Sequence, residues 1–127
     1  MKRTPADKDF SNYIRARDNW TCQRCGSKFK DEDGNVIPGK SLQGLHCSHY
    51  HSRGINSVRL EPDNCVALCH GCHRHFDIRD QKAHTEFMIR RLGQDRYDTL
   101  LLQRHSYKKK DPFMDKLMVK ALLKELE

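Results

Sequence analysis

Apolar residues are scarce in this chain, and no long apolar run occurs in it. Hydrophobic residues make up 36% and charged residues 32% of its 127 residues, so packing alone would give one domain of this size a thin core. No segment approaches the roughly 20 apolar residues of a membrane-spanning helix. The opening MKRTPADKDF also lacks the apolar stretch of a signal peptide. These absences argue against a membrane partner and favour a cytoplasmic location.

Acidic residues are outnumbered. The chain has 17 Asp and Glu against 24 Lys and Arg, which gives a net charge of +7. Such a balance favours a polyanionic partner, and DNA is the expected one. The first candidates for contacts with DNA phosphates are Arg53, Arg74 and Arg79, and Arg90, Arg91, Arg96 and Lys108–Lys110 could extend the track. Because a single surface arginine is more often merely solvated, each contact is a hypothesis.

The cysteines are arranged in a pattern typical of metal sites. Four of the six form two Cys-x-x-Cys pairs, Cys22/Cys25 and Cys69/Cys72. In a reducing compartment this spacing favours zinc over disulfides, and four thiolates leave the ion no open position, so the zinc would be structural. A redox-active pair is the alternative, but no thioredoxin-like βαβ pattern surrounds either pair. Cys47 and Cys65 stand outside the pairs and are interpreted as small buried fillers.

Local signals predict a single domain over residues 1–127, with both helices and strands. Thr4 and Pro5 mark a helix start, and Gly93 marks a helix end. The expected elements are a helix from Pro5 to about Asn19, strands over 45–50 and 65–68, a helix beginning near Cys69, helices over 81–92 and 95–105, and a last helix beginning near Asp111. They divide into an N-terminal helix (1–20), a core that contains the cysteine pairs (21–79) and a helical C-terminal extension (80–127).

Two predictions concern the C-terminal extension. The apolar positions of the last helix form one stripe, made of Met114, Leu117, Met118, Ala121, Leu122 and Leu126. We expect this stripe to pack in the core, with a homodimer contact as the alternative. His84 and His105 are expected at the surface.

The segment between the cysteine pairs resembles a known nuclease family. The stretches SHYHSRG (48–54), VRLEPDNC (58–65) and LCHGCHR (68–74) are similar to the HNH, or ββα-metal, endonucleases in their zinc-stapled form. They resemble most closely the phage NinG/Rap recombination nucleases. The segment HTEFMIRRLGQDRYDTLLL (84–102) also resembles the helical part of that family. The resemblance covers about residues 20–105 and implies an α+β fold with a small ββα-metal core held by a four-cysteine zinc site.

The resemblance also implies roles for three residues. His49 would be the general base that takes a proton from the attacking water, a task that suits imidazole near neutral pH. The Asn64 amide would bond the backbone of the loop after His49 and orient the imidazole. His73 would ligate a catalytic divalent ion, Mg²⁺ or Mn²⁺, at the scissile phosphate.

One position departs from the family. Many HNH enzymes have Asp directly before the base as a second metal ligand, and this chain has Ser48 there. His51 shares the face of His49 if the first strand continues that far, which makes it an alternative metal ligand. His46 would lie on the other face beside Ser48 and is less favoured.

The sequence therefore predicts a metal-dependent HNH endonuclease that hydrolyses DNA phosphodiester bonds. By resemblance it would act in phage recombination on branched or single-stranded DNA, in the cytoplasm of a bacterial host. The alternatives are a non-catalytic zinc-ribbon module that binds DNA, and a general HNH nicking enzyme associated with DNA packaging or restriction. The binding module explains the cysteines and the charge, but not the placement of His49, Asn64 and His73.

Overall fold

Five α-helices and a two-stranded antiparallel sheet make up the α+β fold of residues 3–127, the part of the chain that the computed structural model describes. Met1 and Lys2, which begin the basic N-terminal segment, lie outside the described residues. The elements are α1 (Pro5–Arg17), β1 (Leu45–His49), β2 (Cys65–Cys69), α2 (His70–Arg74), α3 (Gln81–Leu92), α4 (Gln94–Arg104) and α5 (Pro112–Lys124), with a π-helical turn over His75–Arg79. None of the helices described in residues 3–127 is long and apolar enough to cross a bilayer.

Helix α1 begins where the sequence predicts. The Thr4 hydroxyl accepts a hydrogen bond from the Asp7 backbone N–H at 3.2 Å, and the Asp7 carboxylate accepts one from the Thr4 N–H at 2.8 Å, which completes a capping box. The helix ends at Arg17, two residues before the expected Asn19. It ends early because Asn19 and Trp20 have positive φ angles of 58° and 52°, which turn the chain toward the first cysteine pair.

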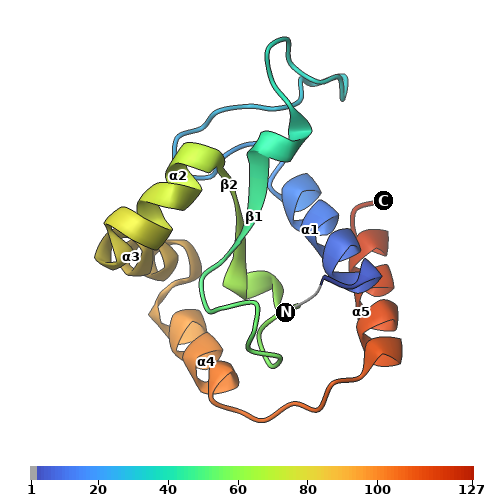
Figure 1. Ribbon diagram of the computed structural model, residues 1–127, viewed down its shortest axis with the longest axis vertical. Helices are drawn as coiled ribbons and strands as arrows, with labels where there is room; N and C mark the ends of the chain where they lie inside the picture. Colours follow the sequence, from blue (N-terminus) through green and yellow to red (C-terminus); the bar gives the residue numbers. More distant parts are fainter. Residues whose placement is uncertain (1–2) are drawn as a thin grey trace.

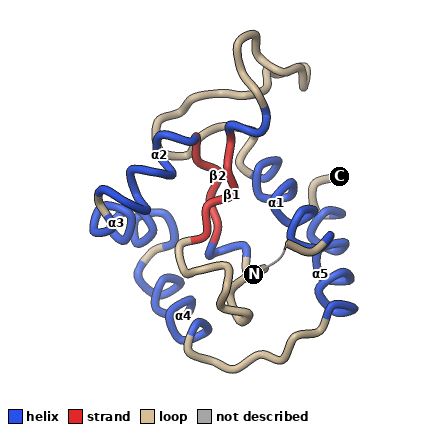
Figure 2. Tube along the Cα trace, viewed as in Figure 1, coloured by secondary structure: helices blue, strands red, loops and turns tan. Residues whose placement is uncertain are grey.

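The two strands pair in a register that runs from Leu45 opposite Cys69 to His49 opposite Cys65. Helix α1 packs against one face of the sheet, and α2 packs against the other, with α3 beyond it (Figure 1). Between α1 and β1 the chain is almost entirely loop (Figure 2). Because side chains alternate along a strand, β1 directs neighbouring residues toward different helices.

The sheet separates two clusters of buried side chains. The larger cluster lies on the side of α2 to α4 and includes Val66, Leu68, Phe76 and Met88. The smaller joins α1 to α5 through Phe10, Ile14, Leu60, Cys65 and Val119. Helix α5 thus returns to lie beside α1 after a long connection from α4 (Figure 1).

A buried ion triad joins three parts of the chain that are distant in sequence. The Arg59 guanidinium contacts the Asp7 carboxylate of α1 at 2.8 Å and the Asp115 carboxylate of α5 at 2.5 Å. The three residues are only 5%, 3% and 6% exposed, respectively. Arg59 precedes β2, so the triad ties both terminal helices to the loop between the strands.

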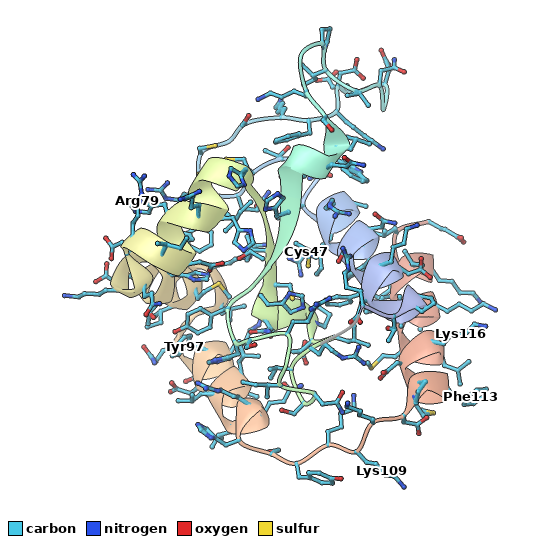
Figure 3. All side chains as sticks on the ribbon, viewed as in Figure 1. Cys47, Arg79, Tyr97, Lys109, Phe113 and Lys116 are labelled. Carbon is cyan, nitrogen blue, oxygen red and sulfur yellow. The ribbon has the colours of Figure 1, made fainter. Side chains whose placement is uncertain are left out.

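The structure corrects two predictions about the C-terminal extension. Most of the apolar stripe does not pack in the core, because Met114, Leu117, Met118 and Leu126 are 52%, 46%, 37% and 42% exposed. Of the stripe, Leu122 packs against the smaller buried cluster. Helix α5 instead packs through the face that carries Asp115, the partner of Arg59, together with Val119, Leu122 and Leu123. Phe113 lies on the outer side of the helix (Figure 3).

The predicted surface position of His84 is also wrong. This residue is buried rather than at the surface, and its ring stacks on Phe76 with centroids 4.6 Å apart. His105 is exposed, as predicted.

The ion triad generates a stability prediction. Replacing Arg59 with Ala leaves the Asp7 and Asp115 carboxylates buried without their shared cation, so we expect the free energy of unfolding to fall by about 3–5 kcal/mol. Urea unfolding at equilibrium measures this loss. Arg96→Ala is the control, because the Arg96 side chain is 61% exposed where it pairs with Asp63; that loss should stay below about 1 kcal/mol. Equal losses in the two variants would contradict a structural role for the triad.

Candidate metal centre and histidine site

Four cysteine sulfurs converge beside the α2 end of the sheet. The Sγ atoms of Cys22, Cys25, Cys69 and Cys72 all lie within 4.8 Å of one another. The Cys25 and Cys69 sulfurs are 3.8 Å apart, which matches the separation of about 3.8 Å between two sulfurs that lie about 2.3 Å from a tetrahedral zinc. This four-cysteine cluster could therefore hold a metal ion such as zinc.

Local backbone geometry presents both pairs to this point. The Cys22 N–H donates to the Ser27 carbonyl and the Gly26 N–H to the Cys22 carbonyl, both at 2.9 Å. Gly26 has a φ of 78°, which a residue with a side chain rarely adopts. The second pair lies at the junction of β2 and α2, with Cys69 ending the strand and Cys72 in the short helix. A cation here would tie the turn after α1 to the sheet and α2.

The thiols of the cluster differ in acidity. Burial raises the pKa of the Cys22 thiol, but hydrogen bonds from the backbone N–H groups of Cys25 and Cys69 outweigh it and lower the pKa to about 7. Burial raises the pKa of Cys72 to about 12. A bound divalent cation deprotonates coordinating thiols, so metal binding here would release protons.

Histidines meet on the face of β1 that α2 covers. The Nδ1 atoms of His46 and His73 lie 2.8 Å apart, and the His70 ring lies edge-on to His46 with centroids 5.4 Å apart. The His73 Nε2 also pairs with an Asp77 carboxylate oxygen at 2.9 Å. Burial, then the neighbouring His73 and His70, lower the pKa of His46. Two converging imidazole nitrogens could ligate a divalent cation.

His46, which the sequence favours less than His51, is the histidine that lies beside His73. It lies two residues before Ser48, and both side chains take the face opposite that of His49. Ser48 is 1% exposed, and its hydroxyl has no hydrogen-bond partner among the described residues 3–127. The signal that could have found His46 is strand alternation combined with the first turn of α2, which brings His73 over that face.

His49 lies on the opposite face of the sheet, against α1. Its Nε2 lies 2.9 Å from the Arg59 carbonyl oxygen, and its ring centroid is 6.3 Å from that of Phe10. A carbonyl can only accept a hydrogen bond, so Nε2 carries the hydrogen and Nδ1 keeps its lone pair. Burial is the largest effect on the pKa of His49 and lowers it, although hydrogen bonds to the Arg59 and Cys47 backbones act to raise it, so the ring is neutral at neutral pH. A neutral imidazole can act as a base or as a metal ligand through the nitrogen that carries no hydrogen.

The Asn64 side chain holds the loop that follows His49. Its Oδ1 accepts from the His51 backbone N–H at 2.8 Å, and its Nδ2 donates to the carbonyls of His51 and Val58 at 3.0 and 3.1 Å. Asn64 is fully buried. These are the backbone contacts that the resemblance implies for this residue, and its part in a reaction stays a prediction.

His51 does not meet the condition for a metal ligand beside His49. Strand β1 ends at His49, and the His51 ring is buried against Tyr50, with centroids 4.6 Å apart. Burial, with the nearby positive charge of Arg104, lowers the pKa of His51 to about 4.

The basic residues divide into exposed and paired ones. Arg74 and Arg79 are exposed, Arg79 at the outer edge of the molecule (Figure 3), and Arg53 is half-buried in the loop after β1. Arg91 is bound to Asp18 at 2.9 Å, and Arg96 is bound to Asp63. Arg91 and Arg96 therefore serve the fold, whereas Arg74 and Arg79 expose their side chains to solvent.

His49 and His73 make separate sets of contacts. His49 faces Phe10 of α1 and the Arg59 carbonyl, whereas His73 contacts His46 and Asp77 on the α2 side. Searches of protein-family models, curated proteins and solved structures find no match to this chain. Its function is therefore inferred from its own residues.

The four-cysteine cluster predicts a metal-dependent fold. Removing zinc with a chelator should lower the free energy of unfolding by several kcal/mol, because metal binding and folding are coupled. Cys72→Ser should show the low stability of the stripped protein both with and without chelator. Thermal unfolding and metal analysis of the two proteins measure this. A Cys72→Ser protein that retained its full zinc content and stability would rule the cluster out as the metal site.

Proposed function

We propose that the protein is a metal-dependent endonuclease of the HNH type that hydrolyses phosphodiester bonds in DNA. The observation that carries the proposal is that the Asn64 side chain holds the loop that follows His49. Asn64 makes two hydrogen bonds to the His51 backbone and one to the Val58 carbonyl, while the neutral His49 ring, with its hydrogen on Nε2, carries a lone pair at Nδ1. A buried amide that orders the loop behind a neutral imidazole is the support that a general base requires.

In this proposal His49 accepts a proton from a water molecule. The water oxygen then attacks phosphorus, the bond to the leaving oxygen breaks, and that oxygen takes a proton from solvent. The Arg59 carbonyl fixes the tautomer of His49 by accepting the hydrogen of Nε2 at 2.9 Å. Because burial lowers the pKa of His49, the ring is in the basic form at neutral pH.

His73 and His46 are the residues proposed to hold the catalytic ion. Their Nδ1 atoms lie 2.8 Å apart. Imidazole can ligate Mn²⁺, Ni²⁺ or Co²⁺, and it can also ligate Mg²⁺ when water molecules complete the coordination. When bound, the ion would supply positive charge to the scissile phosphate and the leaving oxygen. His46 would then take the place of the carboxylate that the family has at the position of Ser48.

DNA is the proposed substrate because of the charge of the chain. With a net charge of +7, the protein attracts polyanions, and Arg74, Arg79 and Lys108–Lys110 are exposed to receive them. Arg53, in the loop beside His49, is proposed to contact the backbone near the cleaved bond. The preference for branched or single-stranded DNA, and a place in phage recombination, come from the family resemblance.

A zinc-ribbon module that binds DNA without cleaving it is the second candidate. The observation in its favour is that His49 contacts Phe10 on one side of the sheet, whereas His73 contacts His46 on the other. If the protein is a nuclease, the scissile phosphate has to reach both His49 and His73 around the end of β1. Cleavage assays therefore decide between the two functions.

His49→Ala tests the nuclease. Loss of the base should lower cleavage by about 10²- to 10⁴-fold, while DNA binding and the zinc content of the four-cysteine cluster stay close to those of the wild type. The assay incubates linear, nicked and four-way DNA with Mg²⁺, Mn²⁺ or a chelator and follows the products on gels. His105→Ala is the matched control, because His105 is exposed beyond α4. This variant should cleave DNA like the wild type.

The pH profile gives a second readout. His49 must be unprotonated to act, so the rate should rise as pH rises through its pKa. Since burial holds that pKa below its usual 6.5, activity should persist in mildly acidic buffer. Binding of all three DNAs without metal-dependent cleavage would instead establish the binding module, and cleavage that survives in His49→Ala would overturn the base assignment.

His46 and His73 should act as a pair toward the metal. Replacing either with Ala should raise the Mn²⁺ concentration for half-maximal cleavage by at least about 10-fold, and the double variant should be little worse than the weaker single one. His75→Ala, on the same helical segment but outside the pair, serves as control. Unchanged Mn²⁺ dependence in His46→Ala would remove it from the ligand set.

A further inference from the structure

A second group of soft ligands lies on the α1 face of the sheet. One ligand atom from each of Cys47, His49 and Cys65 falls within 4.8 Å of the other two. The four-cysteine cluster uses none of these residues, and the proposed nuclease uses His49 alone. From the sequence alone, both cysteines are expected to be small buried residues that fill space in the core.

The strand register produces this convergence. Cys47 and His49 are two residues apart on β1 and so share a face, and Cys65 of β2 stands directly opposite His49. Cys65 is 1% exposed, and Cys47 and His49 are of intermediate exposure. Figure 3 places Cys47 between β1 and α1.

The donor set suits a thiophilic cation. A tetrahedral zinc needs sulfur and nitrogen ligands about 3.6–3.8 Å from one another, so ligand atoms at most 4.8 Å apart reach it with contractions of about 1 Å or less, within the range of side-chain adjustment. Two thiolates neutralise the charge of a divalent ion. Three protein ligands leave the fourth position to water.

The hydrogen bond of His49 is the one that metal-binding histidines make. Such histidines donate their second ring N–H to a carbonyl or carboxylate, which aims the other nitrogen at the ion. His49 donates Nε2–H to the Arg59 carbonyl at 2.9 Å, and in this tautomer Nδ1 is the nitrogen that would ligate a cation. The carbonyl is itself held in place, because the Arg59 side chain is fixed by Asp7 and Asp115.

We propose that Cys47, His49 and Cys65 form a second metal site with thiolate ligands, which binds a thiophilic divalent cation such as Zn²⁺ with water as the fourth ligand. Soft thiolates disfavour Mg²⁺ here, so the site is selective against the ion proposed for catalysis. A cation at this site would be coordinated by the unprotonated ring nitrogen of His49, whose lone pair could then no longer accept a proton. On the proposed nuclease function, its binding therefore inhibits cleavage by removing the base.

Cobalt titration tests the site without reference to activity. Metal-free protein, kept reduced with a phosphine, is titrated with Co²⁺ while the thiolate-to-metal charge-transfer absorbance is followed. The wild type should show two thiolate-bearing equivalents, the second with about half the intensity of the first because two thiolates bind instead of four. Histidine-only binding at His46 and His73 adds no thiolate band.

Two variants and a matched control locate the second equivalent. Cys47→Ser and Cys65→Ser should each lose it and keep the first, which also reports that the variant is folded. Ser48→Ala, on the same strand but the opposite face, should keep both. If Cys65→Ser fails to fold, the titration of Cys47→Ser alone tests the site. A single equivalent in the wild type, or a second one that persists in Cys47→Ser, would overturn the site.

An activity arm separates this inference from the proposed function. In the presence of Mn²⁺, one further equivalent of Zn²⁺ should suppress wild-type cleavage by about 10-fold or more, and the same addition should suppress Cys47→Ser far less. Two thiolate equivalents in a protein that cleaves no DNA would keep the second site and discard the nuclease. Cleavage that Zn²⁺ at the second equivalent leaves unchanged would overturn the inhibition.

Discussion

The antiparallel pairing of β1 with β2 is the constraint on which the rest of the structure depends. An isolated two-stranded sheet is marginal in water, so this one persists only because both faces are covered and both ends are tied. Its register, His49 opposite Cys65 and Leu45 opposite Cys69, also decides which side chains meet. A shift of one residue would exchange the two faces, and with them His46 and Ser48 for Cys47 and His49.

The ends of the sheet are secured by different chemistry. At the α2 end, the four cysteines gather sulfur atoms from the turn after α1 and from the β2–α2 junction. At the other end, Asn64 binds backbone groups of His51 and Val58, and Arg59 joins α1 to α5. A chain with so few apolar residues thus supplements its packing with polar contacts at one end of the sheet and with four cysteines that could hold a metal ion at the other.

Features with local causes could be predicted from the sequence. The cap at Thr4, the end of α3 at Gly93 and the cysteine pairs each depend on residues a few positions apart. Features that depend on distant partners could not. The meeting of His46 with His73 needs the exact placement of α2 over β1, the outward stripe of α5 follows from the buried charge of Asp115, and the position of His51 follows from a strand that stops at His49. The roles of His49, Asn64 and His73 in a reaction remain predictions.

Arg59 acts in two ways at once, and this links the last helix to the chemistry of the sheet. Its side chain grips Asp115 of α5, while its carbonyl receives the Nε2 hydrogen of His49. If α5 moves away from the sheet, Arg59 loses one of the two carboxylates that hold its side chain, and the carbonyl that accepts the Nε2 hydrogen of His49 loses part of its support. The last helix of the chain, far from His49 in sequence, is therefore connected through one residue to the hydrogen bond of that imidazole.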